Sequence, residues 1–162
     1  MNGLGSNTAP ANLTVLIYPT GSKQPITRAI PAPPGGLCEN LDLRRWFPNG
    51  SLSIRLSEMP GINLPFLCDY RLYLDNHRLP VPPNRAVLSC FGIPWSGNIV
   101  LARYQGHCVQ YDRDQFGHIT PGDLNTLMVA MELWLRQLLT QGLYNEAMVK
   151  VFPGDKAIKL FE

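Results

Sequence analysis

Charged residues are scarce in this sequence. Asp, Glu, Lys and Arg make up 16% of its 162 residues, and 14 Lys and Arg against 12 Asp and Glu leave a net charge of +2. Globular proteins usually have about 25% charged residues, and a nucleic-acid or anionic membrane surface attracts proteins with a larger positive excess. The composition therefore argues against nucleic acid and membranes as partners, and it favours a protein partner or self-association.

Long apolar runs and export signals are also lacking. No segment approaches the 18 consecutive apolar residues of a membrane-spanning helix. Residues 1–12 have neither a basic start nor an apolar stretch before a cleavage site. The sequence therefore predicts an intracellular protein, cytoplasmic or nuclear. Its four cysteines, which lack zinc-knuckle spacing, are expected to be reduced and buried (Cys38, Cys68, Cys90 and Cys108).

The pattern along the chain predicts a flexible N-terminal tail over residues 1–11 and one globular domain over residues 12–162. Strands are expected at 13–18, 51–56 and 70–74; in the second, Leu52, Ile54 and Leu56 share one face. Asn40 is positioned to cap a short helix that ends at Phe47. Residues 79–84 are expected to be extended, because a residue before proline avoids the helical region.

Two further segments in the second half of the chain have recognisable local patterns. Residues 85–91 follow the capping residue Asn84 and precede Gly92, which fits a two-turn helix, although a buried strand fits as well. Residues 98–104 and 107–112 predict a hairpin around Gly106, with Val100 opposite Tyr111 and Tyr104 opposite His107.

The clearest element is a helix from Pro121 to Thr140. Thr120 is a suitable N-cap, and Asp123 lies three residues later, where a carboxylate meets the positive end of the helix. An apolar stripe at three- and four-residue steps, which Trp134 widens, predicts one buried side (Leu124, Leu127, Met128, Met131, Leu135, Leu138 and Leu139). We therefore expect an α+β domain in which a mostly antiparallel sheet is covered by one long amphipathic helix.

The loop before this helix contains the candidate catalytic groups. His118 with Asp112 or Asp114 could form an acid/base site, and Cys108 is a candidate thiol. The spacing of Asp112, Asp114 and Asp123 also resembles an EF-hand calcium loop. However, Phe116 replaces an oxygen ligand, and Asp123 is shorter than the preferred Glu. A solvated polar loop without a metal is the simpler interpretation.

A second candidate binding site lies in the first half of the chain. Arg44 and Arg45 precede Trp46, and cations beside an aromatic ring can bind single-stranded nucleic acid by stacking. No wider basic stripe accompanies them. A surface arginine pair over a core tryptophan is therefore the simpler explanation.

One segment resembles a known group of proteins. Asn84-Arg85, followed by Gly92-Ile-Pro-Trp95-Ser-Gly97-Asn98-Ile99, is similar to a pattern in short predicted proteins of mushroom-forming fungi, which have no assigned activity. The resemblance, confined mainly to residues 83–101, implies a shared structural unit in which a helix cap precedes a tryptophan-anchored strand. It implies no catalytic residue, and it favours the hairpin over the calcium loop.

These observations lead to three functional hypotheses. The first is a non-catalytic protein-interaction or assembly module, which needs no cofactor. The second is a small enzyme with an acid/base or thiol site near residues 107–123. The third is a single-stranded nucleic-acid-binding protein that uses Arg44, Arg45 and Trp46.

Overall fold

The computed structural model of the chain describes residues 12–31, 41–59, 64–104 and 116–140. In this part of the chain it contains six strands and two helices. They follow one another as β1 (Asn12–Tyr18), β2 (Ile26–Pro31), β3 (Ser51–Met59), β4 (Leu64–Asp75), α2 (Arg85–Phe91), β5 (Ile99–Tyr104), β6 (Phe116–Gly117) and α3 (Pro121–Thr140).

The strands form one antiparallel sheet in the order β2-β1-β5-β4-β3. β6 pairs with the end of β5 through Arg103 and Tyr104, beyond the part of β5 that pairs with β1. There β1 bonds instead to the chain after β6, because the Ile119 amide donates to the Thr14 carbonyl at 3.0 Å. An α+β fold with an antiparallel sheet is therefore confirmed, as is the common face of Leu52, Ile54 and Leu56.

The predicted partner of β5 is wrong. Val100 lies between Ile17 of β1 and Tyr73 of β4, so neither edge is free for Tyr111. Tyr104 likewise pairs with Asp69 and Phe116, which leaves no edge for His107. The alternation in 98–104 does indicate a strand, but its neighbours come from distant parts of the chain. Residues 107–112 themselves lie outside the described residues.

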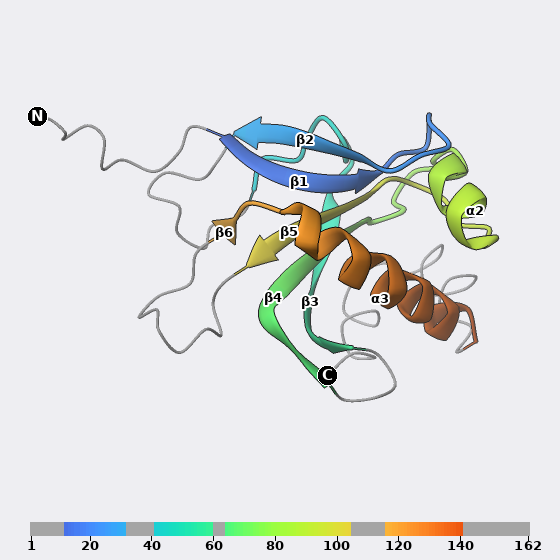
Figure 1. Ribbon diagram of the computed structural model, residues 1–162. Helices are drawn as coiled ribbons and strands as arrows, with labels where there is room; N and C mark the ends of the chain where they lie inside the picture. The colour runs from blue at the N-terminus through green and yellow to red at the C-terminus, as the bar shows by residue number, and fades with distance from the viewer. Residues whose placement is uncertain (1–11, 32–40, 60–63, 105–115, 141–162) are drawn as a thin grey trace, which may run out of the picture.

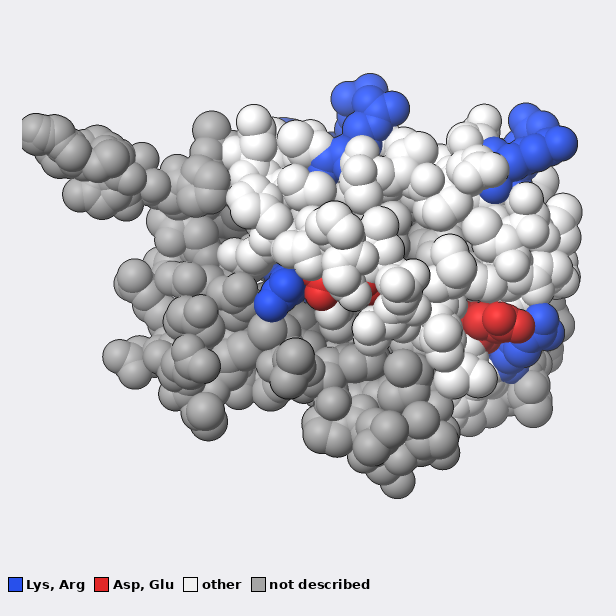
Figure 2. Space-filling view, in the orientation of Figure 1, with Lys and Arg blue, Asp and Glu red and all other residues white. Residues whose placement is uncertain are grey.

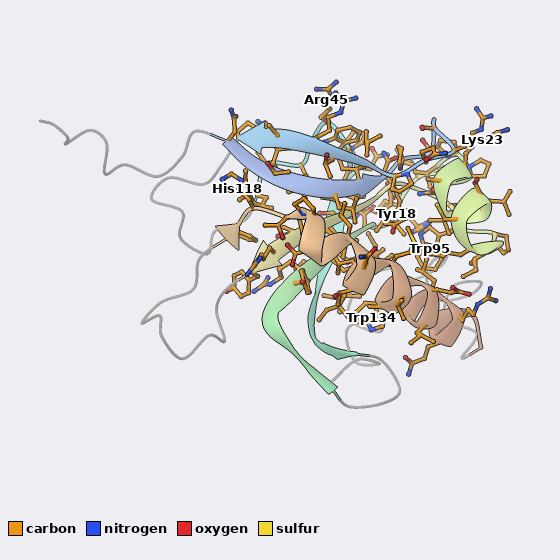
Figure 3. The ribbon with its side chains drawn as sticks, in the orientation of Figure 1. Tyr18, Lys23, Arg45, Trp95, His118 and Trp134 are labelled. Atoms are coloured by element: carbon orange, nitrogen blue, oxygen red, sulfur yellow. The ribbon has the colours of Figure 1, made fainter. Side chains whose placement is uncertain are left out.

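One face of the sheet meets the two helices (Figure 1). Side chains from β1, β3, β4 and β5 share a buried cluster with Leu127, Ala130, Met131, Trp134 and Leu135 of α3. α2 adds Ala86, Val87 and Phe91, so α3 is not the only helix that contributes to this core. Tyr18, Trp95 and Trp134 belong to this cluster, and Figure 3 shows Trp95 beside α2 and Trp134 beside α3. The prediction of buried cysteines is wrong for Cys90, which is a free thiol on the exposed side of α2.

The opposite face of the sheet is buried by the segment before β3. Leu41, Leu43 and Phe47 pack with Val15, Val100 and other residues of β1 and β5. The helix predicted over 40–47 is absent from the described residues 41–47, which form one turn over 44–46. The Phe47 amide donates to the Leu43 carbonyl at 2.8 Å, and Gly50 closes the next turn onto Phe47. The apolar side chains are buried as their spacing predicts, but a single turn is sufficient to bury them.

Local capping residues explain both helices. The Asn84 side chain accepts from the Val87 amide, and Gly92 is left-handed at φ 68°, so residues 85–91 form the helix and not the strand. In α3 the Thr120 amide and hydroxyl both donate to Asp123 Oδ2, at 2.7 and 2.8 Å. The third helical residue thus reaches back to the residue before the helix, as in one half of a capping box, while its own amide donates to the Thr120 carbonyl at 2.9 Å.

The buried side of α3 differs from the prediction at one position. Leu127, Met131 and Leu135 are fully buried as expected, whereas Met128 is 46% exposed. Trp134 is buried as expected, and Ala130 takes part in the buried side as well, so its centre is rotated away from Met128. Leu138 and Leu139 have side chains outside the described set.

Candidate functional site

The polar cluster at the start of α3 is centred on Asp123. Its Oδ1 accepts from the Tyr70 hydroxyl at 2.6 Å, and its Oδ2 accepts from Thr120 and from Arg103 Nη1, the latter at 3.3 Å. Burial acts to raise the pKa of this carboxyl, but the hydrogen bonds from Tyr70 and Thr120 and the charge of Arg103 outweigh it and lower the pKa. The carboxylate thus ties α3 to β4 and β5, and both of its oxygen atoms are already occupied.

His118 lies two residues before Thr120, and its ring takes part in a hydrogen bond that stabilises the fold. Its Nδ1 accepts a hydrogen bond of 3.1 Å from the Thr14 amide, which places the proton of the neutral ring on Nε2. The side chain is exposed at the end of the sheet where β1 begins (Figure 3). An imidazole held through Nδ1 leaves Nε2 as the only nitrogen for proton transfer.

The other candidate catalytic and calcium-binding residues lie outside the described residues: Cys108, Asp112 and Asp114. Of the predicted calcium ligands only Asp123 is placed, and its oxygen atoms bind Tyr70, Thr120 and Arg103. In the described ranges no group of three His, Cys, Asp or Glu side chains could hold a metal ion.

The residues Arg44, Arg45 and Trp46 form the turn that precedes β3. Arg44 forms a two-pronged ion pair with Asp42, both bonds being 3.0 Å, and this hydrogen bonding lowers the pKa of the exposed Asp42 carboxyl. Arg45 lies over the Trp46 ring at 5.4 Å from its centre and extends into solvent (Figure 3). A stacking base would have to replace Arg45 on this ring, so the arrangement resembles a surface arginine pair over a core tryptophan.

Two asparagines at the other end of the sheet, one buried and one half-buried, form a network that the sequence did not reveal. Asn84 is 1% exposed, and its Nδ2 donates to the carbonyls of Tyr18 at 2.7 Å and Gly97 at 2.8 Å. Asn98 donates to the Trp46 carbonyl and accepts from the Thr20 amide. Because β1, the turn before β3 and the start of α2 are joined through these groups, we assign them a structural role.

Gly97 is tightly enclosed in the same region. Its φ is 88°, and a Cβ at this position would lie 2.9 Å from the Asp75 Cβ. Only glycine fits this conformation and spacing without displacement. Together with Asn84 and the buried Trp95, it gives a structural explanation for the segment Asn84–Ile99.

The feature with no structural use is a set of exposed apolar side chains on the helices. Val129 is 54% exposed and Leu133 is 41% exposed, one helical turn apart on α3, and Met128 lies beside them. Leu88 on α2 is 56% exposed. Sequence reasoning missed Val129 and Leu133, although apolar residues within the otherwise polar side of α3 are the available signal.

The charged side chains close to this set are few. In Figure 2 the acidic and basic atoms that lie over α3 are near its two ends, and the surface between them is uncharged. Glu132 and Arg136, which lie on α3, pair with each other at 3.1 Å, so they leave no net charge there. Exposed apolar groups on an uncharged surface are typical of a region that contacts another protein.

Comparisons with protein-family models, curated proteins and solved structures find no match for this chain. None of the helices in the described part of the chain has the length and apolar character that a membrane crossing needs.

Proposed function

We propose that this protein is a non-catalytic protein-interaction or assembly module. The observation that carries the proposal is the outer side of α3, where Met128, Val129 and Leu133 are exposed. We call these three side chains the α3 patch. The partner is another protein or a second copy of this chain.

The rigidity of the helix supports this role. The inner side of α3 is fixed by Leu127, Met131 and Leu135, which are fully buried in the core. The start of α3 is fixed by Asp123, through its bonds to Tyr70 and Arg103. We therefore propose that α3 covers the sheet and that the residues on its outer side are held in position before a partner binds. This preorganisation lowers the entropic cost of binding.

The composition of the patch also suits an interface. The exposed neighbours of the patch are Asn125 and Gln137, which are polar and uncharged, and Glu132 and Arg136, whose charges pair with each other. Apolar and aromatic anchors contribute most to binding where they are surrounded by groups that exclude water without demanding charge partners. A patch of this composition favours a partner that is apolar at its centre.

Light scattering coupled to size exclusion tests the proposal, together with capture of partners from the native cell. The double variant Val129→Lys/Leu133→Lys is expected to lose the association, because two charges would be buried without partners. Gln24→Lys/Thr27→Lys adds the same charge at exposed polar positions of the β1–β2 hairpin, away from α3, and is the matched control. A monomer that captures no partner in wild-type form, or equal behaviour of the two double variants, would contradict the proposal.

A further inference from the structure

The loop between β4 and α2 has an unusual concentration of proline. Arg78-Leu79-Pro80-Val81-Pro82-Pro83-Asn84-Arg85 has three prolines in four residues. Each proline fixes its own φ near −65° and moves the residue before it out of the helical region. After a bend at 78–79 the chain has no helix or strand until α2 begins. Residues 79–83 are thus biased towards the polyproline II conformation.

The loop turns its apolar side chains outward. Polyproline II has three residues per turn, so Leu79 and Pro82 share one edge, Pro80 and Pro83 share the next, and Val81 has the third. Leu79 is 56% exposed, and the three prolines are exposed as well. Val81 is half-buried, and its Cγ2 lies 3.4 Å from the position that a Cβ of Gly97 would take. One edge therefore faces the protein, and the other two face solvent.

The loop is anchored at its C-terminal end. The Gly97 amide donates to the Pro82 carbonyl at 2.9 Å, and Pro83 bridges to Ser96. The Asn84 amide donates to the Trp95 carbonyl at 2.7 Å, and the Asn84 side chain is buried. A segment held in this way loses little conformational freedom when a partner binds it.

Arginines flank the apolar core of the loop. Arg78 precedes Leu79, and Arg85 follows Pro83 by two residues at the start of α2. Both are exposed, and neither guanidinium forms an ion pair within the part of the chain that the structure describes. A partner that binds the two solvent-facing edges of the loop would therefore contact a positive charge at each end of the loop.

We infer that this loop is a docking site for a proline-recognition domain of the SH3 class. Such domains have a groove of aromatic pockets that accept polyproline II segments. Here Leu79-Pro80 and Pro82-Pro83 would fill two successive pockets, with Val81 as the spacer. Arg85 would pair with acidic residues at the end of the groove. This inference rests on the proposed function, and it adds a partner class and a surface separate from the α3 patch.

Titration of the full-length protein tests this inference. The probes are a panel of purified SH3 domains with acidic groove ends and, for comparison, a panel of WW domains, with heat release or NMR shifts as the readout. We expect at least one SH3 domain to bind and to shift the amide signals of Leu79 and Val81. Pro80→Ala/Pro83→Ala and Arg85→Glu are each expected to weaken binding about tenfold or more.

Controls separate this binding from loss of fold and from the α3 patch. Pro94→Ala changes an exposed proline outside the loop and should leave SH3 binding unchanged. Val129→Lys/Leu133→Lys should leave SH3 binding unchanged while abolishing the association through α3. Melting curves and far-UV circular dichroism identify any unfolded variant, and Arg85→Glu, at an exposed position, tests the loop if the proline variant unfolds.

Several results would overturn the inference. Binding of no SH3 domain to the full-length protein, binding only of WW domains, or binding that survives both loop variants would each reject the loop as an SH3 site. These results would leave the α3 proposal intact, because its readout is association through Val129 and Leu133.

Discussion

Replacement of Asn84 by alanine is expected to be among the most damaging single changes to a polar residue of this protein. The Asn84 side chain makes three buried hydrogen bonds: one accepted from the Val87 amide at 2.8 Å, and two donated to the Tyr18 and Gly97 carbonyls. Loss of a helix N-cap costs about 0.5–2 kcal/mol. Each buried carbonyl left without a donor costs roughly 1–3 kcal/mol.

Together these contributions predict a loss of about 2.5–8 kcal/mol in the free energy of unfolding. For a chain of this size that corresponds to a fall in Tm of roughly 5 °C or more. Chemical denaturation and differential scanning calorimetry measure the two quantities. Asn125→Ala, at an exposed position of α3, is the control and should change stability by less than about 0.5 kcal/mol.

A second variant separates the two functions of Asn84. Asn84→Ser keeps an oxygen that can cap α2 but removes the NH₂ group that binds the two carbonyls. We expect it to recover the capping part of the loss, about 1 kcal/mol, and little of the rest. If Asn84→Ala cost less than about 1 kcal/mol, or if Asn84→Ser restored full stability, the assigned network would be refuted.

The remaining predictions concern α3 and the turn that contains Trp46. The pKa of the Asp123 carboxyl is lowered in the folded protein, so the carboxylate stabilises the fold at pH above the ordinary pKa of 3.8, and this stabilisation is lost as pH falls through the folded pKa. Asp123→Asn should therefore reduce the dependence of Tm on pH in this acidic range. A dependence equal to that of the wild type would contradict the prediction. Met131→Asp buries a charge at a fully buried position and should cost several kcal/mol, whereas Met128→Asp, at an exposed position, should cost little, both by urea denaturation. We expect neither the wild type nor Arg45→Ala to bind single-stranded nucleic acid in a fluorescence anisotropy assay. Salt-dependent binding by the wild type that Arg45→Ala removes would favour the nucleic-acid hypothesis.

Features that depend on near neighbours in the sequence could be predicted. Thr120 with Asp123, and Asn84 with Gly92, specify where helices begin or end because a cap contacts residues only a few positions away. The alternation of Leu52, Ile54 and Leu56 likewise identified one face of β3 correctly. Such signals depend on backbone hydrogen bonding within one or two turns.

Features that depend on distant parts of the chain could not be predicted. β5 pairs with β1 and β4, and no local pattern in residues 98–104 specifies these partners. Met128 follows the apolar spacing of α3, but the rotation of the helix about its axis depends on how Ala130 and Trp134 fit the sheet. The Asn84 bonds to Tyr18 and Gly97 exist only once three separate segments meet.

The candidate site was predicted only in part for the same reason. The sequence located Asp123 at the start of α3 but not the Tyr70 and Arg103 groups that occupy its oxygen atoms. Exposure of Val129 and Leu133 depends on which side of α3 the sheet covers, and this is a property of the packed structure.

Site-specific photo-crosslinking at Val129 in the native cell tests the central claim most directly. A photoreactive amino acid in place of Val129 is compared with the same amino acid in place of Thr27, which is exposed on β2. We expect a discrete protein adduct at Val129, with another protein or with a second copy of the chain, and a much weaker one at Thr27. Equal crosslinking at the two positions, or no adduct at either, would contradict it.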